Sequence, residues 1–142
     1  MKNMEQEKEK QSDKQQERQQ EILYKLSIFE QQMHQLQEQV AAVENGMNEL
    51  GSLNFELDEL KGSFGKEILA PVGRGIFVPA TISSETLTVD VGGKNFVKKS
   101  ISETKEIIDE QLKKLVDVKK DIGETIEKVS EEAAKTLKEF QE

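Results

Sequence analysis

Hydrophobic side chains in the first half of the chain recur at steps of four and three residues. From Ile22 to Leu50 the repeating positions are Ile22, Leu26, Phe29, Met33, Leu36, Val40, Val43, Met47 and Leu50. This is the a/d repeat of a coiled coil. We extend the seam through Leu53, Leu57, Leu60 and Phe64, which requires a three-residue break in the heptad phase at Leu53.

A second seam of the same kind occupies the C-terminal part of the chain. Its positions are Ile101, Ile108, Leu112, Leu115, Lys119, Ile122, Ile126, Val129, Ala133, Thr136 and Phe140. Ser100 and Glu103 have the spacing of a capping box, which predicts that this helix starts at about residue 101. Neither helical segment contains proline, as long uninterrupted helices require.

Between the two seams the hydrophobic period changes from helical to two. Alternation of apolar and other side chains predicts four short strands, at about 67–72, 76–82, 86–91 and 95–99. Both prolines and four of the nine glycines fall in this stretch, where they mark turns and strand edges.

The predicted fold class is α+β, with a long antiparallel two-helix coiled coil joined by two β-hairpins. Residues 1–21 form a charged tail or a helix extension, 22–65 the first coiled-coil helix, 66–100 the hairpins and 101–142 the second helix. Isolated hairpins are marginally stable and their edges pair readily with other chains. We therefore expect the hairpins to assemble with neighbouring subunits; the alternative is a self-contained four-stranded sheet on the helix ends.

Two groups of residues are candidates for contacts outside the chain. The candidate subunit interface consists of the apolar strand residues Val72, Ile76, Val78, Ile82, Leu87, Val89, Val91 and Phe96. At the other end of the coiled coil, the first helix has apolar residues in adjacent pairs, and one seam cannot bury both members of a pair. The second helix has small residues opposite them. The candidate tip residues are Ile22, Leu23, Leu26, Phe29, Ala133, Leu137 and Phe140. Their alternative role is to close the seam.

Composition narrows the classes of function. Charged residues make up 34% of the chain and hydrophobic residues 35%, with a net charge of −8, which suits exposed helices. Without a basic footprint, nucleic acid is not expected as a partner. No apolar run has the length of a membrane span or of a signal peptide's core, so we expect a cytoplasmic protein.

The sequence contains no recognisable set of catalytic, metal-binding or phosphate-binding residues. There is no cysteine, and the single histidine, His34, has no second ligand nearby, so we expect neither a metal site nor a catalytic nucleophile. The glycine-rich segment at Gly73–Gly75 lacks the lysine and hydroxyl residue of a phosphate-binding loop. We expect no cofactor and no enzymatic activity.

The arrangement resembles the alpha class of the prefoldin family over residues 22–140. The resemblance depends on Pro71-Val72-Gly73-Arg74-Gly75-Ile76-Phe77-Val78 at the first turn and on Val89-Asp90-Val91-Gly92-Gly93 at the second, between matched coiled-coil helices. Beta-class prefoldins have one hairpin, so four strands favour the alpha class. The charged leader before Ile22 is longer than the family pattern.

The resemblance implies a hexamer of two alpha and four beta subunits whose hairpins form an intersubunit β-barrel. It also implies ATP-independent capture of non-native client proteins at the coiled-coil tips, followed by their transfer to a group II chaperonin. Two alternatives remain open. One is a structural prefoldin-like filament or coiled-coil scaffold built from the same parts; the other is a coiled-coil accessory arm of an enzyme.

Overall fold

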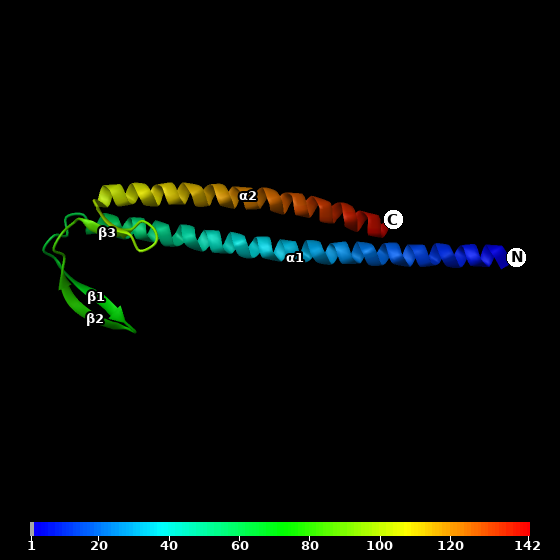
Figure 1. Ribbon diagram of the computed structural model, residues 1–142, viewed down its shortest axis with the longest axis horizontal. Coiled ribbons are helices and arrows are strands. Elements are labelled where there is room, and N and C mark those ends of the chain that lie inside the picture. Colours follow the sequence, from blue (N-terminus) through cyan, green and yellow to red (C-terminus); the bar gives the residue numbers. More distant parts are fainter. Residues whose placement is uncertain (1) are drawn as a thin grey trace. The chain divides into compact units, whose positions relative to one another are not determined.

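The structure, a computed structural model, describes residues 2–142 as a helix, two β-hairpins and a second helix (Figure 1). The elements are α1 (Lys2–Leu60), β1 (Glu67–Gly73), β2 (Ile76–Thr81), β3 (Leu87–Asp90), β4 (Phe96–Lys99) and α2 (Ile101–Gln141). The predicted α+β class, with two long helices joined by two hairpins, is confirmed.

The chain divides into two compact units, and α1 and α2 each contribute to both. The arm unit comprises the residues up to Val43 together with Val118–Glu142, and the hairpin unit comprises Glu44–Asp117. Residues 2–21 belong to α1 rather than to an irregular tail, and residues 3–21 are exposed.

The seam of α1 runs without the phase break that the sequence suggested. After Leu50, the half-buried position is Asn54 and not Leu53, whose surface is 41% exposed. The steps from Leu50 to Asn54 and on to Leu57 are four and three, so the heptad continues unbroken. The placement of Leu53 in the seam was wrong because a polar residue, Asn54, occupies the half-buried position beside it. The placement of Phe64 was also wrong, because α1 ends at Leu60 and Phe64 is exposed.

The seam of α2 changes phase instead. Thr104 is buried between Ile101 and Ile108, where the sequence left a seven-residue gap. From Thr104 the buried positions step by four to Ile108 and by four again to Leu112. Two successive four-residue steps locally unwind a coiled coil.

The hydrophobic core of the hairpin unit lies where the two helices meet the strands. Leu57, Ile101 and Ile108 are buried against one another. Partly buried residues that surround them are Leu50, Leu60, Leu87 and Leu112. Leu87 comes from β3, so the second hairpin is attached to the helix pair through this core.

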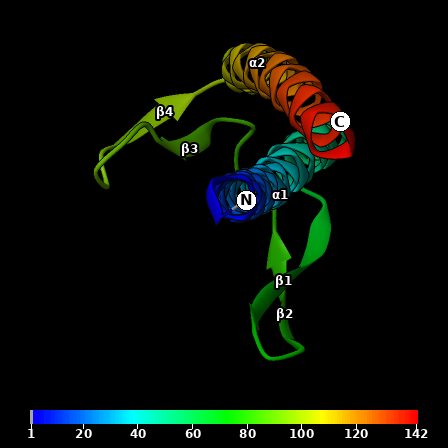
Figure 2. The same cartoon turned by 90° about the vertical axis from the view of Figure 1, so that its right-hand side faces the viewer.

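The strands form two separate two-stranded antiparallel sheets, β1–β2 and β3–β4, and not one four-stranded sheet (Figure 2). The turn of β1–β2 requires left-handed backbone conformations, with φ angles of 136° at Gly73, 49° at Arg74 and 78° at Gly75. Glycine adopts these conformations without steric cost, so the two glycines of this turn fix its position and the register of the strands.

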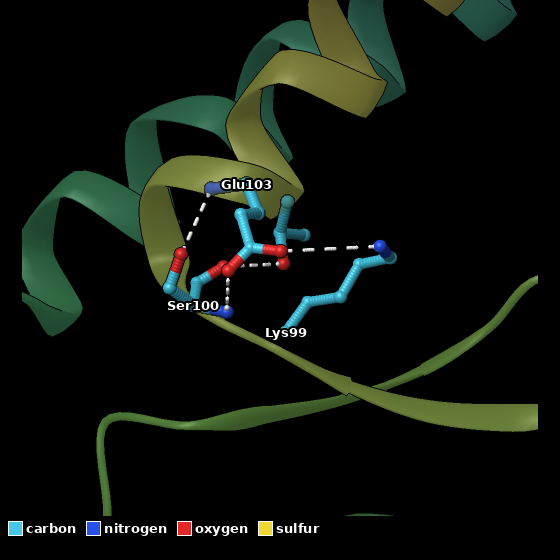
Figure 3. A network of polar contacts seen from close by, with 4 residues as sticks. Lys99, Ser100 and Glu103 are labelled. Carbon is cyan, nitrogen blue, oxygen red and sulfur yellow. Dashed lines mark hydrogen bonds and ion pairs between the residues drawn. The ribbon is translucent and has the colours of Figure 1, made fainter.

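The start of α2 has the capping box that the sequence predicted (Figure 3). The Glu103 backbone N–H donates to Ser100 Oγ at 3.1 Å, and the Ser100 N–H lies 3.4 Å from Glu103 Oε1. Lys99 Nζ lies 4.0 Å from the other carboxylate oxygen of Glu103. These contacts satisfy N–H groups that have no partner within the helix.

Charged side chains that pair with one another cover one flank of the seam in the hairpin unit. Lys105 of α2 donates to Asp58 of α1, and Lys61 lies 3.4 Å from the same carboxylate oxygen. The hydrogen bond from Lys105, helped by the charges of Lys105 and Lys61, holds the pKa of the Asp58 carboxyl below its usual value.

Gly51→Ala should stabilise the chain, because a methyl group there meets no atom within 4 Å and glycine is a poor helix former. We expect a gain of about 0.5–1 kcal/mol in the free energy of unfolding, measured by urea denaturation. Gly62→Ala is the control: Gly62 has a φ of 75°, so alanine there should destabilise. Equal effects of the two substitutions would contradict this account.

The Asp58 carboxyl should show a pKa below the usual value of an aspartate in an NMR titration, and Lys105→Met should raise that pKa. Because the pKa is lower in the folded chain, the ion pair stabilises the fold above the unfolded-state pKa of Asp58. That contribution is lost as the pH falls through the folded-state pKa. An Asp58 pKa unchanged by Lys105→Met would show that the lysine is not the cause.

Candidate functional site

Both faces of the β1–β2 hairpin are apolar and exposed. The register pairs Ala70 with Val78 on one face and Pro71 with Phe77 on the other. The exposed large hydrophobic residues of this hairpin are Ile68, Leu69, Val72, Ile76, Phe77 and Val78. A two-stranded sheet with apolar side chains on both faces is not stable by itself in water, so this hairpin is a candidate contact surface.

The two prolines lie on the outer edges of this hairpin. The Ile82 N–H donates to Lys66 O, and hydrogen-bonded pairs alternate along an antiparallel ladder. The pairs Leu69–Pro79 and Pro71–Phe77 are therefore the ones whose backbone groups point outward. Each edge keeps outward N–H groups, at Leu69 on β1 and at Phe77 on β2, but is interrupted by a proline that has no donor.

The second hairpin is covered on one face by its own chain. Leu87 packs on the buried cluster of the helices, and Val89 is half-buried beside it. Val91 and Phe96 are exposed.

Of the eight predicted interface residues, five are therefore exposed: Val72, Ile76, Val78, Val91 and Phe96. The other three, Ile82, Leu87 and Val89, are half-buried. The prediction left out Ile68, Leu69 and Phe77. Once the glycine turn fixes the register, the apolar cross-strand pairs containing these residues follow from the sequence. The interface role of all these residues stays a prediction.

In the arm unit, the predicted tip residues separate into two groups. Ile22 is buried, and the side chains that close the seam with it are half-buried: Leu26, Phe29, Ala133 and Phe140. Leu23 and Leu137 are 53% and 47% exposed. The exposed surface predicted at this end thus consists of Leu23 on α1 and Leu137 on α2.

A groove of about 550 Å³ runs along one side of the seam in the arm unit. It is lined by Leu26, Phe29, Glu30, Met33, His34, Gln37, Val129, Ser130 and Ala133. Its lining combines the small side chains of Ser130 and Ala133 on α2 with the large ones of Phe29 and Met33 on α1. The sequence predicted small residues opposite large ones at Ala133, and placed Val129 in the second seam, but it missed Met33 and Ser130 as lining residues.

Leu23 and Leu137 extend this groove toward the end of α2. Leu23 is seven residues before Glu30, and Leu137 is seven residues after Ser130; a spacing of seven places residues on one helix face. Tyr24 does not share that face and lines a different, polar hollow with Glu17 and Gln20. The two exposed leucines thus lie on the same side of the helix pair as the groove, beyond the residues that line it.

Charge around the groove is sparse. Glu30 and His34 are on its wall, and His34 Nε2 lies 3.0 Å from Glu38 Oε1, one turn further along α1. Within residues 2–142, no group of three or more histidine, cysteine, aspartate or glutamate side chains is placed to hold a metal ion. In the same part of the chain, no helix is long and apolar enough to cross a membrane.

Comparison with known proteins places these features in a family. The family model described as prefoldin subunit matches residues 29–142. The prefoldin subunit alpha of Methanobrevibacter smithii is 30% identical over 98 residues, which are 68% of this chain and 67% of that protein. The prefoldin subunit alpha of Methanosphaera stadtmanae is 23% identical over 88 residues, which are 62% of this chain and 64% of that protein.

The fold is also that of a solved structure. A cryo-EM structure of filamentous PFD from Methanocaldococcus jannaschii matches with a TM-score of 0.75 and 19% sequence identity. The match covers 82% of this chain and 98% of the other. Residues 2–28, the N-terminal part of α1, lie outside the family match.

Proposed function

Since this chain belongs to the prefoldin subunit family, we propose that it is the alpha-class subunit of an ATP-independent chaperone that captures unfolded proteins in the arm-unit groove. The observation that carries the proposal is the apolar groove extended by the exposed side chains of Leu23 and Leu137. Non-native proteins expose apolar segments, and such segments gain most by leaving water in an apolar groove.

Capture by one groove is weak, and the proposed assembly overcomes this weakness. The groove is open and shallow, so a client segment buries only part of its surface there. When several subunits project their helix pairs from one assembly, a client held by one groove meets the others at high effective concentration. We propose the assembly implied by the family, two alpha and four beta subunits joined through their hairpins into a β-barrel.

We further propose that captured clients pass to a group II chaperonin in the cytoplasm. A shallow groove favours transfer, because contacts that are individually weak exchange rapidly for those of a second binding surface. No step in capture or transfer requires nucleotide. The turn at Gly73–Gly75 accordingly serves the hairpin and has no phosphate-binding role in this proposal.

Replacing Leu23 and Leu137 together by serine should abolish suppression of aggregation, measured by light scattering of a denatured protein diluted into the chaperone. The two side chains are exposed, so the seam and the oligomer should be unaffected. We leave Phe140 unchanged because it is half-buried in the seam.

The matched control for this experiment is Tyr24→Ser. Tyr24 is adjacent to Leu23 and 69% exposed, but it lies off the face that lines the groove. Its loss should leave aggregation suppression within twofold of the wild type. Full activity in the double leucine variant would refute the groove as the capture site, and equal loss in Tyr24→Ser would show that capture is not confined to this face.

The assembly is tested by mixing the chain with a beta-class prefoldin subunit and measuring mass by native mass spectrometry. The proposal predicts a discrete species of two alpha and four beta subunits that suppresses aggregation without ATP. An open-ended polymer of this chain would instead favour the filament or scaffold function, since a heterologous contact that does not close forms a filament.

A further inference from the structure

The groove of the arm unit shares one wall with a second, polar hollow. This hollow has a volume of about 500 Å³ and is lined by Ser27, Glu30, Gln31, His34 and Gln35, all from α1. Glu30 and His34 also line the apolar groove. These two side chains therefore lie between an apolar compartment and one lined by hydroxyl, amide and carboxylate oxygens, which accept hydrogen bonds.

Glu30 is a carboxylate on this shared wall that has no cationic partner. It is exposed, and within residues 2–142 no ion pair joins it to another side chain. The next carboxylate along α1 is different, because Glu38 Oε1 lies 3.0 Å from His34 Nε2. The negative charge of Glu30 is thus left for a group from outside the chain.

The lysines of the facing helix lie away from the groove. Lys128 and Lys135 are each two residues before a residue on the groove's face, Ser130 and Leu137. Helical residues two apart do not share a face. None of the residues that line the groove or the polar hollow is lysine or arginine, so both compartments have an acidic wall and lack a matching cation.

We propose that the groove and the polar hollow together bind an apolar client segment that carries a lysine or arginine. The inference rests on the proposed function in taking the groove as the capture site, and it adds the chemistry of the preferred client. Apolar side chains of the client occupy the groove. The aliphatic part of the basic side chain lies on the apolar wall, and its charged end reaches Glu30 and the amide oxygens of Gln31 and Gln35.

The charge of Glu30 makes capture selective without making it tight. A client segment with a carboxylate at the same place is disfavoured by like charge, and an uncharged apolar segment gains nothing from Glu30. Because the site is exposed, one ion pair there strengthens binding by no more than about fivefold. Several grooves in one assembly multiply this preference.

The first test compares two labelled peptides of leucine, alanine and serine that differ at one central residue, which is arginine or its uncharged analogue citrulline. Binding to the full-length chain is measured by fluorescence anisotropy. The arginine peptide should bind about threefold more tightly at low salt. The difference should shrink at high salt, because the pair is exposed to solvent.

The second test reverses the charge of the wall and compares it with a matched control. Glu30→Lys should reverse the preference, so that the citrulline peptide binds more tightly than the arginine peptide. Glu132→Lys changes the net charge equally, but Glu132 is exposed and two residues beyond Ser130, so it faces away from the groove. The control should keep the wild-type ratio of the two affinities, with helix content by circular dichroism unchanged in both variants.

Equal binding of the two peptides, or equal effects of Glu30→Lys and Glu132→Lys on their ratio, would overturn the charge preference and leave capture in the groove intact. Failure of the proposed function gives a different result. In that case neither peptide binds, or both bind equally well after Leu23 and Leu137 are replaced by serine, and the preferred client falls with the capture site.

Discussion

A two-stranded sheet cannot bury its own side chains, so the β1–β2 hairpin has no hydrophobic core of its own. Leu69 and Phe77 lie on one face and Ile68 and Val78 on the other, all exposed. A single chain buries at most one face of such a hairpin, as β3–β4 does with Leu87 against the helices. The first hairpin is therefore exposed on both faces in the single chain, and the proposed assembly is what covers it.

The same chain leaves a second apolar surface exposed, in the arm unit, for a different reason. There Ile22 is buried in the seam, but the helices leave a groove beside it that is lined by small side chains from α2 and large ones from α1. The exposed hairpin and the open groove are both consistent with a subunit that assembles with others and binds a client. In the proposed function, the hairpins join several helix pairs into one assembly, and the grooves of that assembly act jointly on one client.

Local patterns in the sequence predicted most of the fold. The heptads, the Ser100–Glu103 cap and the four strands all depend on side chains close in sequence, and each lies within a few residues of its predicted place. The seam position was wrongly assigned to Leu53 instead of Asn54. Leucine is the more hydrophobic of the two, but the buried positions on either side determine the phase of the heptad. The two-sided exposure of β1–β2 required the strand register and the absence of a covering helix, which no local pattern contains.

Hydrogen exchange in residues 67–81 tests the central claim most directly. The outward N–H groups of Leu69 and Phe77 should exchange rapidly in the chain at concentrations where it does not self-associate. They should become protected once a beta-class prefoldin subunit is added and the hairpin is covered. Protection already present in the lone chain, or none gained in the assembly, would contradict the claim that neighbours complete this hairpin.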